Sequence, residues 1–281
     1  MLFRSTGIVN LFIEQLYKTI RSVKPWVKFG VSPFGIYQNK SAAHPGGSNT
    51  HGLQNYDELY ADVMLWVEKG WLDYCVPQIY WEIGNKAANY QTLIYWWTQN
   101  CSNRPLFIGE DVERTVKFNQ QSQKRQLYSQ LYGNKSNSSS LSGTVLWYAK
   151  AAVDNVGGYG TQLRNNYWRV PALQPSMPFI SKATPKKVTK VKPMWTSDGY
   201  VLFWKAPKAK GWEQEAAKYV VYRFENKEKI DISDASHIVA ITTTPWYRLP
   251  YENGKDKYIY VVTALNRLDN ESTYVKKRIK L

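Results

Sequence analysis

The sequence has few of the residues from which small cross-linked or metal-held domains are built. Only two cysteines, Cys75 and Cys101, occur among 281 residues, so a disulfide framework is excluded by number. Neither cysteine belongs to a CxxC motif or to a cysteine–histidine cluster, and no spacing typical of a zinc site is present. Cys75 lies within an apolar run and is predicted to be a buried thiol. We therefore expect no metal and no other cofactor.

Long apolar runs are absent as well. No stretch is long and apolar enough to cross a membrane. Residues 1–8 lack the apolar core of a signal peptide, an absence that means little if the chain begins in mid-domain, as we expect below.

Positive charge is abundant but not concentrated in a known motif. The net charge is +15, and basic charge by itself is compatible with acidic polymers or nucleic acid. Because the chain has no arginine-rich block and no recognised nucleic-acid motif, we do not expect nucleic acid as a partner. The lysine cluster after Ala183 is interpreted as a solvated linker and strand edge; it comprises Lys186, Lys187, Lys190 and Lys192.

Apolar and aromatic residues are plentiful. Residues of the hydrophobic class make up 43% of the chain, which is enough for well-formed cores. The 12 tryptophans and 21 tyrosines mostly have a packing role, since large aromatic side chains dominate core burial. The alternative for some of them is a sugar-binding surface. A length of 281 residues predicts two domains.

The first part of the chain alternates helical and strand patterns. Apolar residues at helical spacing predict helices at 8–23, 56–69, 90–100 and 116–132. Short apolar runs predict strands at 27–32, 73–80, 105–109 and 143–148. Such alternation is typical of parallel strands joined by helical crossovers.

Four strands are half of an eight-stranded (β/α) barrel, which needs about 250 residues. An open half-barrel would expose two long strand edges, which natural proteins avoid. We therefore expect residues 1–180 to be the carboxy-terminal part, about the last four strands, of a TIM-type (β/α)8 barrel. An open, doubly wound sheet is the alternative.

The pattern changes to a period of two from about Thr184. Short strands with turn residues between them are predicted at 201–204, 219–222, 238–241 and 258–262. Their number and spacing indicate an all-β sandwich at 184–281, of the size of immunoglobulin-like modules. The proline-containing segment 171–185 leads up to this boundary.

Several long motifs resemble one family. Residues 23–36 read VKPWVKFGVSPFGI, residues 70–84 read GWLDYCVPQIYWEIG, residues 88–97 read ANYQTLIYWW, and residues 106–109 read LFIG. This ordered set, within residues 8–170, resembles the glycosyl hydrolase-like 10 family, whose members include bacterial envelope lipoproteins. The resemblance implies a barrel that is often followed by a fibronectin-like domain.

The family resemblance also implies what lies outside this chain. Family members carry an aspartate-rich strand before the first helix seen here, and the resemblance implies that this chain begins after it. The family's main catalytic carboxylate is then absent from the chain. Residues 184–281 resemble fibronectin type III domains, with Trp204 and Tyr260 at positions of core aromatic residues.

In a barrel, catalytic residues lie at the carboxyl ends of strands, and glycoside hydrolysis commonly needs two carboxyl groups. Gln78 is polar in mid-strand and would be costly against outer helices, so it is predicted to face the barrel interior. Strand alternation places Tyr80 and Glu82 with it. Glu82 is thus a predicted catalytic carboxylate, and a solvated loop acid is the alternative.

The next strand ends in Glu110 and Asp111, either of which has the chemistry of a general acid. We predict Glu110 as the second catalytic carboxylate; an ordinary loop acid is again the alternative. Aromatic, amide and hydroxyl groups near strand ends are predicted to bind substrate: Gln78, Tyr80, Trp81, Trp147, Ser32 and Tyr37.

These features favour a glycoside hydrolase-like protein that acts on a bacterial envelope or secreted glycan by carboxylate acid/base catalysis. We expect it to be incomplete in this chain and to be an enzyme when full length. The partner is a poly- or oligosaccharide, and the expected location is secreted or in the cell envelope. A non-catalytic carbohydrate-binding or scaffold protein with a barrel cleft is the alternative. The sequence leaves the oligomeric state open.

Overall fold

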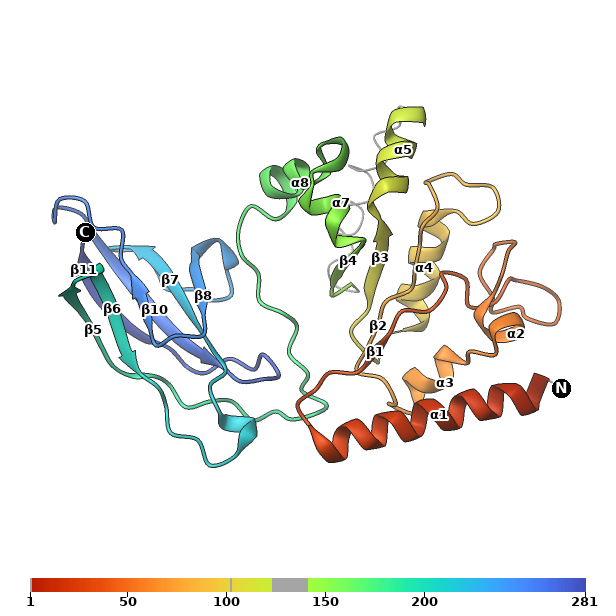
Figure 1. Cartoon of the computed structure of the whole chain (residues 1–281), viewed down its shortest axis with the longest axis horizontal. Coiled ribbons are helices and arrows are strands. Elements are labelled where there is room, and N and C mark those ends of the chain that lie inside the picture. Colours follow the sequence, from red (N-terminus) through yellow and green to blue (C-terminus); the bar gives the residue numbers. More distant parts are fainter. Residues whose placement is uncertain (1, 102, 123–140) are drawn as a thin grey trace. The chain divides into compact units, whose positions relative to one another are not determined.

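The chain divides into two compact units, residues 1–167 and 168–281, in a computed structural model (Figure 1). The structure describes residues 2–101, 103–122 and 141–281. Each unit has its own hydrophobic core. No helix within these ranges has the length and apolar character needed to span a membrane.

The first unit alternates helices and strands. In chain order its elements are α1 (Leu2–Val23), β1 (Gly30–Val31), α2 (Asn55–Leu59), α3 (Val63–Glu68), β2 (Tyr74–Cys75), α4 (Tyr90–Asn100), β3 (Phe107–Asp111), α5 (Val112–Ser122), β4 (Gly143–Trp147), α7 (Ala149–Val153), η1 (Val156–Gly158), α8 (Tyr159–Gln162) and the π-helical turn η2 (Leu163–Tyr167).

The four strands are parallel and lie side by side in chain order, which confirms the sequence prediction. β1 pairs with β2, and β3 pairs with β4. Isolated parallel bridges join β2 to β3, and another extends the β1–β2 contact; these bridges are Cys75–Leu106, Gln78–Gly109 and Phe34–Gln78. The neighbour order β1-β2-β3-β4 follows.

β1 and β2 are only two residues long each, shorter than predicted. Pro33 and Pro77 follow them closely. Since proline has no backbone N–H to donate, a regular ladder is interrupted at each of these positions. Pairing resumes as isolated bridges at Phe34 and Gln78.

Two helix predictions differ from the structure. The expected helix at 56–69 is two helices, because Tyr60 adopts a left-handed conformation (φ 55°) and Asp62 starts a new helix by accepting a hydrogen bond from the Leu65 amide at 3.1 Å. α5 begins at Val112 rather than Val116, and its predicted end at residue 132 lies outside the described residues, as does most of the loop predicted at 134–142.

One face of the parallel strands is covered by helices. Cys75, Ile79 and Ile108 are completely buried on this face, in a core that also contains residues of α1, α3 and α4. The prediction that Cys75 is a buried thiol is confirmed, and Cys101 is also a buried free cysteine.

A buried carboxylate joins three elements at the start of β2. Asp73 has no solvent exposure, and its Oδ2 accepts hydrogen bonds from Arg21 of α1 and from the Phe29 amide, the latter at 2.6 Å. The Asp73 amide donates in turn to the Phe29 carbonyl at 2.6 Å. Burial raises the pKa of Asp73, although the Phe29 N–H and Arg21 act in the opposite direction.

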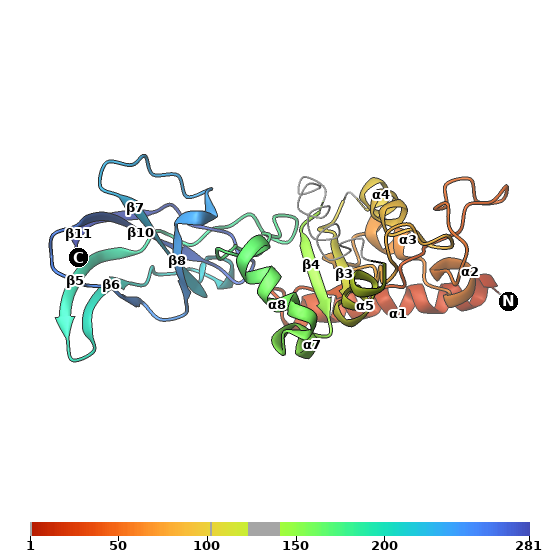
Figure 2. The ribbon, with the colours of Figure 1, turned by 90° about the horizontal axis from the view of Figure 1, so that it is seen from above.

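The second unit is an antiparallel sandwich of two sheets (Figure 2). One sheet has the order β5-β6-β9 and the other β11-β10-β7-β8. The elements are β5 (Thr189–Thr196), β6 (Gly199–Lys205), η3 (Trp212–Gln214), β7 (Lys218–Glu225), η4 (Ala235–His237), β8 (Ile238–Thr242), β9 (Trp246–Arg248), β10 (Lys257–Leu265) and β11 (Val275–Lys280). All four strands predicted here are confirmed, within β6, β7, β8 and β10.

The two sheets enclose a core that contains Trp204 and Tyr260, so both are buried as expected. Part of the other face of the four-stranded sheet is buried too. There Leu173, Ile230 and Ile232 pack with the buried Tyr222 and with other residues of that sheet. The segment that precedes β5 is therefore part of this unit's packing.

We expect Asp73→Ala to lower the free energy of unfolding of the first unit by about 3–5 kcal/mol. The Arg21 side chain is only 18% exposed and would lose its carboxylate partner. Urea denaturation followed by tryptophan fluorescence measures the effect. Glu68→Ala is the control, because that side chain is 71% exposed and lies 3.8 Å from Lys69, and its loss should cost less than about 1 kcal/mol. Equal effects of the two substitutions would contradict this account.

Candidate functional site

The strand register separates an open face from the helix-covered face. Residues that pair across parallel strands lie on the same side of the sheet. Gln78 is opposite Gly109, and Gly109 is opposite Val145, which is 45% exposed. Two residues further on, the same register places Tyr80, Asp111 and Trp147 in one row. This row lies at the carboxyl ends of three neighbouring strands, where parallel sheets carry their sites.

Gln78 lies between the first two strands on the open face, as predicted. It is half-buried, and its Nε2 donates to the Ser32 carbonyl at 2.9 Å. The Ser32 hydroxyl donates to the Val76 carbonyl at 2.9 Å. Both side chains thus link β1 to β2, and the structure brings these two predicted substrate-binding residues together.

Asp111 is held by the first turn of α5. Its Oδ1 accepts from the Arg114 amide at 2.9 Å, and its Oδ2 lies 3.7 Å from Arg114 Nε. Arg114 Nη1 also lies 3.5 Å from the Tyr80 carbonyl oxygen. Burial raises the pKa of the Tyr80 hydroxyl, and the charges of Asp111 and then Glu110 raise it further. Tyr80, Asp111 and Arg114 therefore form one interacting group.

The end of β4 presents two exposed aromatic side chains. Trp147 is 59% exposed and Tyr148 is 40% exposed, and the peptide bond between them is cis. The Tyr148 hydroxyl donates to Glu113 Oε1 at 3.0 Å, which raises the pKa of Tyr148. Glu113 and Arg114 were not predicted as site residues. The acidic residues that continue from Asp111 to Glu113 were the signal in the sequence that could have indicated them.

Glu110 lies on the other side of β3 and does not join this row. Its side chain is completely buried, and Oε1 accepts a hydrogen bond from the hydroxyl of Tyr90, the first residue of α4. Its charge also contributes, after burial, to the raised pKa of Tyr159. The sequence predicted Glu110 as the second catalytic carboxylate, which requires it to lie on the same face as Gln78 and Tyr80. Because β3 continues regularly to Asp111, alternation places Asp111 on the open face and Glu110 against the helices.

Glu82 belongs to a structured loop beyond the last strand bridge. Its Oε1 accepts from Asn85 Nδ2 at 2.9 Å, and Asn85 Oδ1 accepts from the amides of Ala87 and Ala88. Glu82 is half-buried. The strand alternation on which its predicted orientation rests does not extend this far, since the last bridge is at Gln78. Its catalytic role stays a prediction.

Trp81 and Tyr37 pack against their own unit. Trp81 meets Phe34 edge-on at 5.4 Å between ring centroids, and it covers Gly35 so closely that a Cβ there would lie 2.7 Å from its ring. Tyr37 is only 9% exposed and stacks on Trp96, with ring centroids 5.5 Å apart. Tyr37 is thus engaged in packing, and its substrate-binding role stays a prediction.

The Tyr37 hydroxyl is also engaged. It donates to Asp62 Oδ1 at 2.8 Å. Burial and, next, the charge of Asp62 raise the pKa of Tyr37. Tyr37 thus connects the long loop after β1 to the start of α3.

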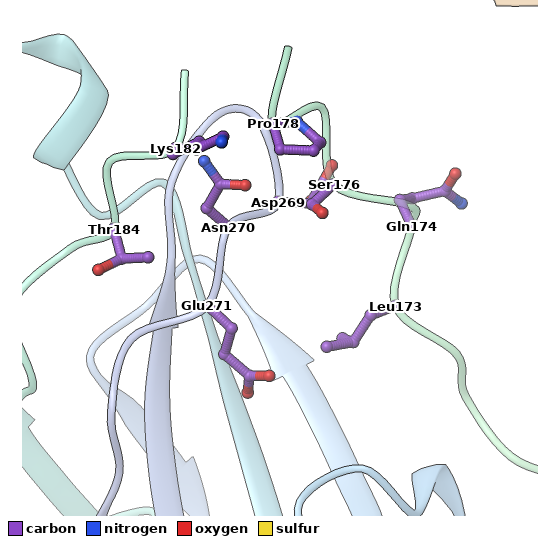
Figure 3. A pocket seen from close by; sticks show the side chains of 9 residues that line it. All are labelled: Leu173, Gln174, Ser176, Pro178, Lys182, Thr184, Asp269, Asn270 and Glu271. Atoms are coloured by element: carbon purple, nitrogen blue, oxygen red, sulfur yellow. The ribbon is translucent and has the colours of Figure 1, made fainter. Parts of the chain in front are cut away.

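A cleft of about 350 Å³ lies within the second unit (Figure 3). It lies between the segment at 173–184 and the loop at 269–271. Asn270 Nδ2 donates to the carbonyls of Ser181 and Ala183, and Glu271 Oε1 accepts from the hydroxyls of Tyr222 and Thr263. These polar lining groups already form hydrogen bonds within the protein. The cleft is therefore the contact region between the segment at 173–184 and the sandwich.

No group of three or more metal-ligating side chains is found in the part of the chain that the structure describes. The open-face row carries one carboxylate, one phenol and one indole, with Arg114 beside the carboxylate. Side chains of these types can bind a ligand through hydrogen bonds, through charge and through contact with an aromatic ring.

Comparison with known proteins identifies the first unit. Residues 3–129 match the family described as Glycosyl hydrolase-like 10. Over these residues the chain is similar to that family. The match begins within α1, continues through α5 and ends at residue 129.

Two similar curated proteins are named as glycosyl hydrolases. The chain is 35% identical over 283 residues to glycosyl hydrolase YngK of Bacillus subtilis (strain 168), an alignment that covers 97% of this chain and 54% of the relative. It is 52% identical over 99 residues to glycosyl hydrolase DigH of Escherichia coli (strain K12), covering 34% of this chain and 22% of the relative. The aligned part of this chain thus spans about half of the length of YngK and a smaller share, 22%, of the length of DigH.

Similar solved structures include fibronectin type III modules. The sixth fibronectin type III domain of human fibronectin type III domain containing protein 3 matches with a TM-score of 0.26 and 14% identity, over 35% of this chain and 87% of that domain. Domains d3-d4 of rat CD45 match with a TM-score of 0.27 and 16% identity, over 35% of this chain and 51% of theirs. The sandwich assignment here rests on the three-plus-four sheet order itself.

Tyr90→Phe should lower the free energy of unfolding by about 1.5–3 kcal/mol, because it removes a hydrogen bond to the buried Glu110 carboxylate. Tyr95→Phe is the matched control on the same helix, since Tyr95 is 69% exposed. Chemical denaturation of both variants measures the difference. If Tyr90→Phe were as stable as the control, Glu110 would not depend on this contact.

Proposed function

We propose that this chain is the carboxy-terminal part of a glycoside hydrolase-like (β/α) barrel protein that hydrolyses a bacterial envelope or secreted glycan by carboxylate acid/base catalysis. Four parallel strands in sequential order support the barrel part of the proposal. The kinship with YngK, of which the alignment covers 54%, supports both the chemistry and the incompleteness of the barrel.

The observation that carries the proposal is the row of Tyr80, Asp111 and Trp147 at the carboxyl ends of β2, β3 and β4. It combines a carboxylate with an exposed aromatic ring at the place where barrels perform chemistry. Glycoside hydrolysis needs a second carboxyl group within about 5–10 Å of the first. Glu82 is the candidate within this chain, and an upstream strand is the candidate outside it.

A non-catalytic glycan-binding protein is the second candidate. Asp111 is already used to cap α5, which by itself explains why a carboxylate stands there. Under this alternative Trp147 and Tyr148 bind the glycan and no bond is broken. The two candidates differ in what happens when the negative charge of Asp111 is removed.

We further propose that the protein acts outside the cytoplasm, as a secreted or envelope-attached protein. A glycan of the cell envelope is accessible there. Fractionation of cells that express the complete natural protein tests this directly.

The chain as it stands should bind soluble envelope glycan strands weakly and release no product. Trp147→Ala should reduce this binding roughly tenfold, because an aromatic contact contributes on the order of 1–1.5 kcal/mol. Isothermal titration calorimetry measures the affinity. Trp168→Ala is the control, since Trp168 is 51% exposed but belongs to the second unit. Unchanged binding by Trp147→Ala would remove the open face from the proposed site.

In a longer form that includes the upstream strands, Asp111→Asn should lower kcat by about 10²–10⁴-fold. Asparagine is as good a helix cap as aspartate, so the substitution removes the charge and keeps α5 in place. Glu82→Gln and Glu110→Gln, assayed alongside, show which carboxylates the reaction uses. If all three variants kept full turnover, carboxylate catalysis by this part of the protein would be refuted.

A further inference from the structure

Two neighbouring edge strands of the second unit carry a high positive charge. β5 is the edge of the three-stranded sheet and β11 is the edge of the four-stranded sheet, and the two strands contact each other (Figure 2). Eight basic side chains, all exposed, lie on these strands or just before them. We call this set the basic flank; it consists of Lys186, Lys187, Lys190, Lys192, Lys276, Lys277, Arg278 and Lys280.

The charge of the basic flank is not neutralised by the protein. None of its eight members forms an ion pair with a carboxylate within the described parts of the chain, whereas Lys218 pairs with Asp269 at 2.9 Å and Arg267 with Glu215 at 3.6 Å. In the β10–β11 ladder, Lys280 even lies opposite Lys257. Like charges directly opposite each other destabilise a sheet.

Protection of sheet edges is the ordinary reason for lysines on such strands. It does not explain their number here. The edge strands on the other side of the sandwich, β8 and β9, together carry a single cation, Arg248. One side of the sandwich thus has far more positive charge than edge protection needs.

The spacing of the basic flank suits an extended polyanion. Lys276, Arg278 and Lys280 are alternate residues of one strand, so they share a face and follow one another at about 7 Å. Lys190 and Lys192 add two further cations on the neighbouring edge strand, next to a bulge between Thr189 and Lys192. A linear polymer with a negative charge on successive units matches such rows.

An exposed aromatic group lies on the same edge strand. Trp195 of β5 is 61% exposed and stacks on Tyr200, with ring centroids 4.9 Å apart. Tyr251 meets Trp195 edge-on, also at 4.9 Å. Exposed tryptophans supported in this way are common at binding surfaces, where the ring offers an apolar face.

We propose that the basic flank binds an anionic polysaccharide, a glycan chain that carries carboxylate or phosphate groups on successive units. Charge complementarity defines the anionic character of the partner. The choice of a glycan rests on the proposed function, and Trp195 adds a ring face for sugar units. The surface is a second glycan-binding site, on residues other than those of the open-face row.

Calorimetric titration of the full chain with polygalacturonate tests the proposal, with uncharged dextran of similar length as the comparison. A quadruple variant with glutamine at 190, 192, 276 and 277 should bind polygalacturonate at least roughly tenfold more weakly, and the salt dependence of binding should become shallower. The matched control removes four exposed lysines elsewhere in the unit: Lys208→Gln, Lys210→Gln, Lys227→Gln and Lys229→Gln. It should change the affinity less than about twofold.

Three outcomes would overturn the proposal. One is an equal loss in the control variant, which would attribute binding to net charge alone. Another is equally tight binding of dextran. The third is equally tight binding of single-stranded DNA that is lost in the same variant, which would make the surface a general polyanion or nucleic-acid site. A third variant that carries Lys190→Arg, Lys192→Arg, Lys276→Arg and Lys277→Arg retains the charge and should retain binding.

The two glycan sites are separable in this experiment. Trp147→Ala should leave polygalacturonate binding unchanged, because Trp147 belongs to the first unit. The flank variant should leave Trp147-dependent binding unchanged. If the unsubstituted chain failed to bind polygalacturonate while Trp147-dependent binding was intact, this inference would be refuted and the proposed function would stand. Thermal unfolding verifies that the exposed substitutions preserve the fold.

Discussion

The strand arrangement of the first unit depends on the buried carboxylate of Asp73. Asp73 fixes the last turn of α1, the approach to β1 and the start of β2 through Arg21 and the Phe29 amide. β1 and β2 are too short to define their own register strongly, since each contributes only two ladder residues. The buried Asp73, just before β2, helps to fix this register. A shift of the strands relative to each other would leave Asp73 and Arg21 without their partners in a poorly solvated place.

That register determines which residues can act together. A shift by one residue would exchange the open face and the helix-covered face along an entire strand. With the register fixed, Gln78 and Tyr80 lie with Asp111 and Trp147, and Glu110 lies with the core residue Ile108. The candidate chemistry at the strand ends is thus a consequence of contacts made at the opposite ends of the same strands.

Much of this arrangement could be predicted from the sequence. Alternating apolar patterns give the strand order of the first unit and the two-period strands of the second, and a polar residue in mid-strand identifies Gln78 as an open-face residue. The position of Glu110 was not predicted, because β3 extends two residues beyond its predicted end at Gly109 and the alternation of side chains along the strand then decides the face. The end of α2 at Tyr60 was not predicted either, because the helical spacing of apolar residues continues past Tyr60. The helix ends there because the Tyr60 backbone is left-handed.

The segment before β5 changes how the second unit should be delimited. Leu173 covers part of the outer face of the four-stranded sheet, and the carbonyls of Ser181 and Ala183 receive the amide of Asn270. This stretch therefore packs on the sandwich and is more than a connector. A recombinant fragment that starts at Thr184 would expose an apolar sheet surface to solvent and invite self-association, whereas one that starts at Trp168 would keep that surface sealed.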